Sequence, residues 1–223
     1  MLLTFPEITN IDKEQINEYP LRAFSGNLHI VDNSTIHNEA IKYLSSKPIL
    51  GFDTETKPCF HKGNSHSVAL LQLSDSENAF LFRINKIGIS NDIMKIFQDQ
   101  SILKVGVAIR DDLKALQKIR KFKPQGFFEL QDFVKLFGIE NFGLKTLAPI
   151  VLGFRISKAQ QLSNWENSEL TLPQLTYAAT DAWVSYLLYI KLQENIHLLN
   201  QRKETKISEE AELNQINPTE EEN

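Results

Sequence analysis

The chain has 223 residues, 42% of them hydrophobic, which is enough to bury one substantial core. Its net charge of −4 comes from the C-terminal segment, because the residues from Lys203 onward include two lysines and seven glutamates and leave the rest near neutrality. The single cysteine, Cys59, excludes an internal disulfide, and the lack of a long apolar run excludes a membrane span, so we expect a cytoplasmic protein.

We expect three regions along the chain. Residues 1–25 form an irregular arm, residues 26–200 form one compact domain, and residues 201–223 form an acidic tail. The tail is polar, rich in glutamate and without aromatic residues, so it is predicted to be disordered.

Within the compact domain, strand patterns come first and then alternate with helical patterns. A helix over 35–46, capped by Ser34 or Thr35, precedes three strands joined by short turns, and helices separate the later strands. This order predicts an α/β fold with a mixed five-stranded sheet flanked by helices. The expected strands span 49–54, 68–74, 78–83, 103–108 and 127–130, and the further helices span 91–99, 112–121, 131–137, 143–151 and 173–198.

Two acidic residues, Asp53 and Glu55, lie at the C-terminal end of the first expected strand. Side chains two residues apart on a strand share a face, so both carboxylates project the same way. Two like charges held so closely are unfavourable unless a cation neutralises them. Mg²⁺ and Mn²⁺ prefer oxygen ligands, so the pair is a candidate metal site. The alternative for this D-x-E pattern by itself is an ordinary solvated strand end.

The last expected helix contains Tyr177 and Asp181, four residues apart. Thr171 is the expected N-cap, and Pro173 suits the first turn. A spacing of four places both side chains on one helix face, and the alanines around them let a strand approach that face closely. The alternative is a buried tyrosine beside a capping or salt-bridged aspartate.

Between these two fragments, Arg110-Asp111-Asp112 follows the strand expected at 103–108 and leads into a helix. Either aspartate would be favoured there by the positive end of the helix dipole, which is the usual role of such residues. Spacing alone does not decide between Asp111 and Asp112.

Taken in chain order, the three fragments resemble the three motifs of the DEDD superfamily of exonucleases, in its Tyr-containing (DEDDy) branch. They are similar to the exonuclease domain of the Werner-syndrome helicase and, a little further off, to ribonuclease D. The resemblance includes VALLQLS at 68–74, the spacing from Gly106 to Asp112 and the tripeptide SNW at 163–165. It covers about residues 25–200 and selects Asp112 over Asp111.

The resemblance implies a ribonuclease H-like fold whose five expected strands, numbered by appearance, lie in the order 3-2-1-4-5. It also implies a 3′-5′ exonuclease that acts on DNA or RNA with two Mg²⁺ or Mn²⁺ ions and releases nucleoside 5′-monophosphates. In such an enzyme Tyr177 orients the attacking water. The implied catalytic residues are Asp53, Glu55, Asp112, Tyr177 and Asp181, and the four acids among them are the implied metal ligands. The chain has no Walker loop, so no nucleotide cofactor is expected.

Two groups of residues are candidate nucleic-acid contacts. Lysines beside the first motif can reach phosphates, and a basic cluster lies at the end of the helix expected over 112–121, although such a charge run is more often a solvated helix end. The candidates are Thr54, Thr56, Lys57, Lys62, Lys118 and Lys121.

Two other functions stay open. One is a catalytically inactive nucleic-acid-binding module of the same fold, which would normally lack at least one of the acids. The other is a plain metal-binding or interaction domain. The motifs do not distinguish DNA from RNA, because contacts to the 2′-hydroxyl come from loops, and they do not indicate the oligomeric state.

Overall fold

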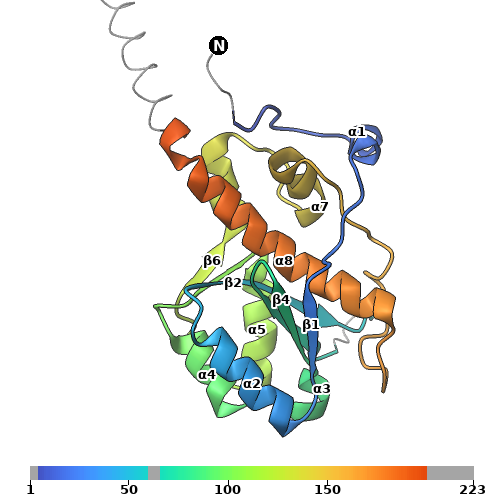
Figure 1. The fold of residues 1–223 in the computed structure, drawn as a ribbon, viewed down its shortest axis with the longest axis vertical. Coiled ribbons are helices and arrows are strands. Elements are labelled where there is room, and N and C mark those ends of the chain that lie inside the picture. Colours follow the sequence, from blue (N-terminus) through green and yellow to red (C-terminus); the bar gives the residue numbers. More distant parts are fainter. Residues whose placement is uncertain (1–4, 60–65, 200–223) are drawn as a thin grey trace, which may run out of the picture.

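The computed structural model describes residues 5–59 and 66–199, and in these ranges it contains one mixed sheet of six strands (Figure 1). Across the sheet the strands are β1 (Asn27–Val31), β4 (Asn78–Phe82), β3 (Val68–Ser74), β2 (Ile49–Thr56), β5 (Leu103–Gly106) and β6 (Phe127–Glu129). Strand β3 is antiparallel to both β2 and β4, whereas β1 is parallel to β4, and β2, β5 and β6 are parallel to one another.

The sheet has six strands where five were expected, so the full order differs, but the five expected strands keep the predicted relative order 3-2-1-4-5 as β4, β3, β2, β5 and β6. Strand β1 was missed, and it adds a sixth strand at the edge beside β4, with Asn27 opposite Asn78. Its sequence NLHIV has polar residues at the first and third positions, so the apolar pattern is too short to predict a strand, and its conformation depends on pairing with a distant segment. Strand β2 extends to Thr56, so Asp53 and Glu55 lie within the strand.

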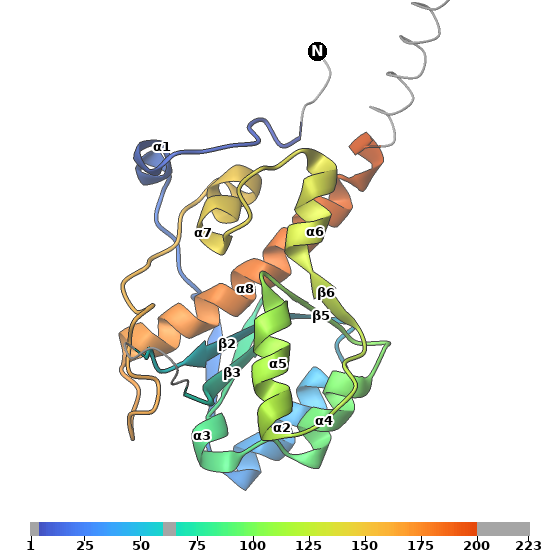
Figure 2. The same cartoon turned by 180° about the vertical axis from the view of Figure 1, so that it is seen from behind.

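Long helices cover the two faces of this sheet (Figures 1 and 2). Helix α8 (Leu172–Glu194) crosses one face diagonally, and helices α2 (Ser34–Leu44), α4 (Asn91–Gln98) and α5 (Ile109–Ile119) lie on the other. The expected N-cap of α8 is confirmed, because the hydroxyl of Thr171 accepts from a backbone N–H of the first turn. The expected cap of α2 is wrong: the residue before Ser34, an asparagine, caps that helix through its side-chain oxygen.

The remaining helical segments are short. The helices expected over 131–137 and 143–151 are each interrupted, the first by a 3₁₀ turn and the second by a π-helical turn. These segments are α1 (Lys13–Glu18), α3 (Ile84–Ile87), α6 (Leu130–Val134), η1 (Lys135–Phe137), α7 (Leu144–Leu147) and η2 (Ala148–Leu152). In the described part of the chain, no helix has both the length and the hydropathy that crossing a bilayer requires.

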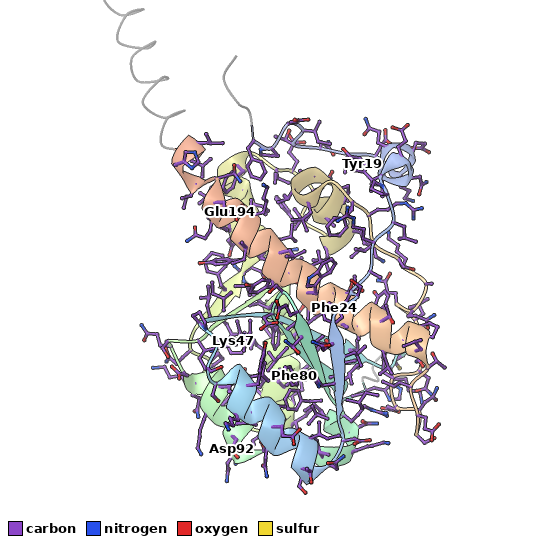
Figure 3. All side chains as sticks on the ribbon, in the orientation of Figure 1. Tyr19, Phe24, Lys47, Phe80, Asp92 and Glu194 are labelled. Atoms are coloured by element: carbon purple, nitrogen blue, oxygen red, sulfur yellow. The ribbon has the colours of Figure 1, made fainter. Side chains whose placement is uncertain are left out.

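The N-terminal segment, expected to be an irregular arm, contains helix α1 and packs on the domain. Leu21 forms a parallel β-bridge with Arg155, and the backbone N–H of Phe24 donates to the hydroxyl of Thr180 on α8 at 2.9 Å. The ring of Phe24 lies 6.0 Å from that of Trp183, beside α8 (Figure 3). The segment therefore forms one side of the region around the middle of α8. The acidic tail predicted for 201–223 lies outside the described residues.

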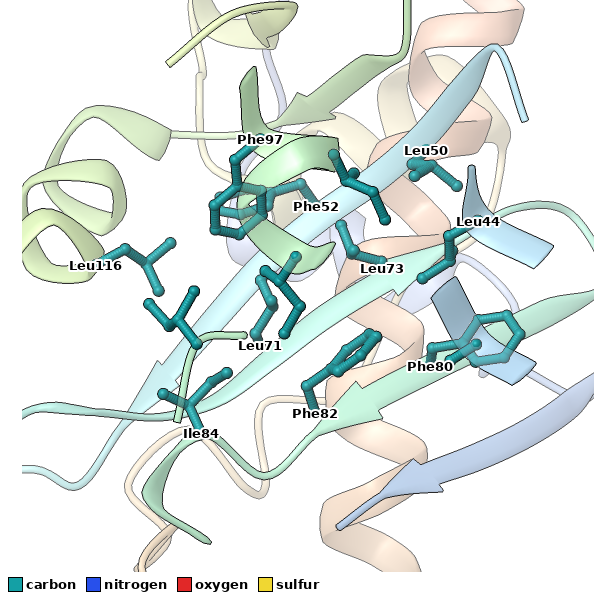
Figure 4. Packing of buried hydrophobic residues seen from close by; sticks show 14 of the residues in the cluster. Leu44, Leu50, Phe52, Leu71, Leu73, Phe80, Phe82, Ile84, Phe97 and Leu116 are labelled. Atoms are coloured by element: carbon teal, nitrogen blue, oxygen red, sulfur yellow. The ribbon is translucent and has the colours of Figure 1, made fainter. Parts of the chain in front are cut away.

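Alternate residues of the central strands face opposite sides of the sheet. On the side of α2, α4 and α5, strand side chains pack into an apolar core, with Leu50, Phe52, Leu71, Leu73 and Phe82 at its centre (Figure 4). Because side chains alternate along a strand, the residues between these point toward α8 instead. The positions that face α8 include the two acidic residues of β2.

Candidate active site

Strand β2 presents Asp53 and Glu55 to helix α8 at very short range. Gly51 lies on the same face, and a Cβ atom placed on it would be only 1.9 Å from the carbonyl oxygen of Ala182. Only glycine lets the two backbones come so close. A register shift between Glu55 and Thr56 marks a β-bulge at the end of the pairing with β3, and bulges of this kind re-aim neighbouring side chains.

Helix α8 contributes Tyr177 and Asp181 to the same place. The Asp181 carboxylate joins those of Asp53 and Glu55, and one oxygen from each of the three residues lies within 4.8 Å of the other two. Asp181 is 6% exposed, and its Oδ1 atom is buried with no hydrogen-bond partner among the described residues. Tyr177 is 8% exposed, with its ring centroid 6.0 Å from that of Trp165. The expected contact between strand and helix is therefore present.

The cluster is electrostatically unfavourable when no cation is bound. Burial, together with repulsion from the neighbouring carboxylates, raises the pKa of Asp53 well above its usual value and that of Glu55 to about 9. Burial likewise raises the pKa of Asp181 to about 7. The pKa of Tyr177 is also raised, first by burial and then by the charge of Asp181, so its hydroxyl keeps its proton at neutral pH. Three carboxylates in this state fit a site for a hard divalent cation.

Asp112 lies on α5, beside the cluster of three carboxylates rather than within it. Its carboxylate accepts a hydrogen bond from the hydroxyl of Thr54, the β2 residue between Asp53 and Glu55. It is close enough for its charge to raise the pKa of both of those acids. Burial raises the pKa of Asp112 itself, and the hydrogen bond from Thr54 opposes that rise. Asp111, by contrast, points into solvent and pairs with Lys114 at 2.8 Å.

A tight turn between β5 and α5 sets the position of Asp112. Ala108, the N-cap of α5, has φ +62°, in the left-handed region that an alanine rarely adopts. The carboxylate of Glu129 holds this turn, because its two oxygens accept the backbone N–H groups of Ala108 and Ile109, each at 2.9 Å. No sequence pattern indicates this role, since Glu129 is the last residue of the short strand β6 and matches no motif.

A cavity of about 390 Å³ opens beside the acids, and two lysines that the sequence analysis did not identify contribute to its lining. Lys145 and Lys158 line it together with Asp53, Tyr177 and Asp181. Burial lowers the pKa of Lys145 to about 8, although the charges of Asp181 and Glu55 act in the opposite direction. Both lysines lie in segments of irregular or short helical structure, where no periodic pattern marks a functional position.

The residues expected to contact nucleic acid lie in several parts of the structure. The Thr54 hydroxyl is hydrogen-bonded to Asp112, and Lys57 pairs with Glu166 at 3.4 Å. Lys118 is exposed near the other end of α5, about 9 Å along the helix axis from Asp112, and Lys121 is exposed just beyond that end. Thr56 ends β2, and Lys62 lies outside the described residues. A role in substrate binding stays a prediction for all of these residues.

Comparison with known proteins gives concordant results. A model of the 3′-5′ exonuclease family matches residues 28–197. The bifunctional 3′-5′ exonuclease/ATP-dependent helicase WRN of Mus musculus is 35% identical over 167 residues, which cover 72% of this chain and only 12% of the mouse protein.

Two solved structures have a similar fold. The EXO domain of Aedes aegypti Nibbler aligns with a TM-score of 0.72 at 22% identity, over 81% of this chain and 96% of that domain. Ribonuclease D of Escherichia coli, described as an exoribonuclease involved in structured RNA processing, aligns with a TM-score of 0.67 at 20% identity, over 82% of this chain and 50% of its own. These similarities confirm the expected ribonuclease H-like α/β fold. Because the family model matches well over half of its residues, this chain belongs to the 3′-5′ exonuclease family.

Proposed function

We propose that this chain removes nucleotides from the 3′ end of a nucleic acid by hydrolysis and releases nucleoside 5′-monophosphates, as a member of the DEDDy branch. The observation that supports this best is the cluster of Asp53, Glu55 and Asp181, which lies beside the buried hydroxyl of Tyr177 and opens into a cavity. Asp112 lies next to the cluster, so all four acids and the tyrosine of the motif set belong to one region.

The donor atoms fit divalent cations, and metal dependence is general in this family. In our proposal these residues would hold two Mg²⁺ or Mn²⁺ ions: Asp53 would be shared between the ions, Glu55 and Asp181 would complete one site, and Asp112 would support the other. The unpartnered Oδ1 atom of Asp181 and the raised pKa values of the carboxylates support this assignment, because both features indicate buried acids whose charge Lys145 compensates only in part. When bound, such ions activate a water for attack and stabilise the charge of the departing 3′-oxygen.

Tyr177 is assigned the orientation of the attacking water. Its pKa is raised by burial and by nearby negative charge, so at neutral pH the phenol acts as a hydrogen-bond donor or acceptor and is not a base. Its hydroxyl lies beside Asp181, where it can hold a water in line with the bond to be broken. Orientation by a fixed hydrogen bond requires no change in the protonation of the tyrosine.

Lys145 and Lys158 are assigned to the phosphates of the substrate. Both line the cavity beside the carboxylates, on the side of α7 and of the segment that precedes α8. A phosphodiester chain entering an acidic site needs cationic groups nearby to offset its charge, and lysine ammonium groups are common phosphate ligands. Because they line the cavity beside the acids, these two lysines are our first candidates for contact with the scissile phosphate.

Degradation of end-labelled oligonucleotides tests the proposal. Single-stranded and 3′-recessed DNA and RNA of matched sequence are incubated with Mg²⁺, with Mn²⁺ or with EDTA, and products are identified by chromatography. We expect stepwise shortening from the 3′ end, release of 5′-monophosphates and complete loss of activity in EDTA, and no activity in the control variant Asp53→Asn. Internal cleavage only, or undiminished activity in EDTA, would contradict the proposal. Relative rates on the matched substrates decide between DNA and RNA.

The same experiment addresses a catalytically inactive binding module. Such a module would retain oligonucleotides in a filter-binding or gel-shift assay and leave them intact in Mn²⁺. The four acids and the tyrosine of the motif set are all present, which favours the enzyme.

A further inference from the structure

Gln72, on strand β3, is a polar residue in a place where its amide group has no partner. Its relative exposure is 0%, and neither its Nε2 nor its Oε1 atom has a hydrogen-bond partner in the described part of the chain. Buried side-chain amides nearly always form hydrogen bonds, so this unpaired amide calls for an explanation.

The strand register places Gln72 directly opposite Asp53. The two residues are paired in the antiparallel ladder of β2 and β3, and the Cβ atoms of such partners lie about 5 Å apart on the same face of the sheet. That face is the one covered by α8, because Gly51, two residues before Asp53, meets the backbone of Ala182. The Gln72 side chain therefore lies on the α8 side, next to the carboxylate proposed to bridge two ions.

The other surroundings of Gln72 are apolar. Its partner on the far side, in β4, is Leu81, which is 0% exposed, and Leu70 on the same strand is also fully buried. Buried alanines of α8, Ala178 and Ala179, belong to the same cluster as these leucines. Across the ladder pairs of β3, the acidic partner of Gln72 is Asp53, and no charged residue lies opposite it on β4.

We infer that Gln72 is a positioning residue for Asp53. The Gln72 amide has no partner in this structure; once the carboxylate opposite it is ionised, the amide N–H donates to one carboxylate oxygen and leaves the remaining lone pairs directed toward divalent cations. This inference rests on the proposed function, because it concerns the residue proposed to bridge the ions. An amide suits this role because it donates a hydrogen bond without adding a positive charge that would compete with the ions. A carboxylate has enough lone pairs to accept this hydrogen bond and to bind cations as well. Hydrogen bonds of this kind fix the orientation of metal-binding carboxylates.

The test measures binding of Mn²⁺ alone, by electron paramagnetic resonance, to the full chain and to variants. Gln72→Met keeps the length and volume of the side chain and removes its donor. We expect it to weaken Mn²⁺ binding about 10- to 100-fold, the usual effect of losing a residue that orients a metal ligand. The midpoint of thermal unfolding without metal should stay equal or rise, because an unpaired buried amide is replaced by an apolar group.

Ser74→Ala is the matched control. Ser74 lies on the same strand and face, is also 0% exposed, and pairs with Gly51 instead of an acid. Its hydroxyl donates to the carbonyl oxygens of Asp75 and Asn78 at 2.9 and 3.1 Å, so its removal changes a buried polar group without touching Asp53. Mn²⁺ affinity should be unchanged in this variant. If Gln72→Met does not fold, Gln72→Asn replaces it, since the shorter amide cannot reach the carboxylate and should also weaken binding.

Two results would overturn the inference, and they are distinguishable. Wild-type Mn²⁺ affinity in the Gln72 variants would show that the amide serves packing alone, and would leave the proposed function intact. Failure of the unaltered chain to bind Mn²⁺ at all would remove the metal site, and the proposed mechanism would fall with the inference.

Discussion

Raising the pH from 6 to 8 without divalent metal should destabilise this protein through the carboxylates of Glu55 and Asp181. Their pKa values in the fold, about 9 and about 7, lie above those of exposed acids, first because both groups are buried. The folded protein therefore holds protons that the unfolded chain has released. Below about pH 4 the two carboxyl groups are protonated in the folded and in the unfolded protein, and the stability that these protons provide is fully present. This stability is lost as the pH rises through the pKa values of the folded state.

The size of the effect follows from the two pKa values. For each proton that is bound only in the folded state, the free energy of unfolding falls by about 1.4 kcal/mol with every unit by which the pH rises. Between pH 6 and 8, Glu55 stays mostly protonated in the fold and contributes a loss of about 3 kcal/mol, whereas Asp181 titrates within this interval and contributes about 1 kcal/mol. For a chain of this size, about 4 kcal/mol corresponds to a fall of roughly 8–16 °C in the midpoint of thermal unfolding.

Urea unfolding followed by tryptophan fluorescence, in EDTA at pH 6, 7 and 8, measures this loss. The control is the double variant Glu55→Gln, Asp181→Asn, which keeps the shape of the site and lacks the two carboxylates whose titration is counted here, so its stability should change less over the same interval. Excess Mg²⁺ should also reduce the decline of the wild type, because a bound cation favours the ionised carboxylates. Parallel decline of the wild type and the double variant would refute the reasoning, since the pH dependence would then arise elsewhere.

Three further predictions concern single residues and are checked by single-turnover rates and substrate affinities. Tyr177→Phe should slow hydrolysis about 30- to 1000-fold, because an orienting hydrogen bond is lost, with little change in affinity; a wild-type rate would make the tyrosine a packing residue. Asp112→Asn should lower the rate at least about 100-fold, whereas Asp111→Asn, which alters only an exposed ion pair with Lys114, should lower it far less; equal losses would contradict the assignment. Lys145→Met should weaken substrate binding or turnover about 10- to 100-fold, as expected for a lost charged hydrogen bond to phosphate, and unaltered kinetics would exclude that contact.

The parts of the site that the sequence predicted depend on local geometry. A spacing of two on a strand and of four on a helix determines which side chains share a face, whatever the rest of the fold does. This is why Asp53 and Glu55 could be paired from the sequence, and Tyr177 with Asp181. The pair on β2 and the pair on α8 can approach each other because small residues line the interface between strand and helix. These small residues are Gly51 and the alanines of α8.

The parts that the sequence did not predict depend on contacts between distant segments. Strand β1 exists because it pairs with β4, some fifty residues away. Glu129 holds the turn before α5 from the end of another strand, and Lys145 reaches the acids from a short helix without periodicity. Lys57 looked available for a phosphate, but in the fold it is paired with Glu166. In each case the partner is set by tertiary packing, which no spacing rule within one segment contains.

The alternation of β2 makes the fold and the site depend on each other. Leu50 and Phe52 anchor the apolar core on one face, while Asp53 and Glu55 face α8 on the other. A shift of one residue in the register would turn the acids into the core and the apolar residues toward the helix, so the core fixes the place of the carboxylates. The packing free energy of that core must therefore also hold three buried acidic groups together when no cation is present. Metal binding and folding stability are for this reason coupled in the same few residues, and a variant that relieves the repulsion should stabilise the fold as it abolishes the site.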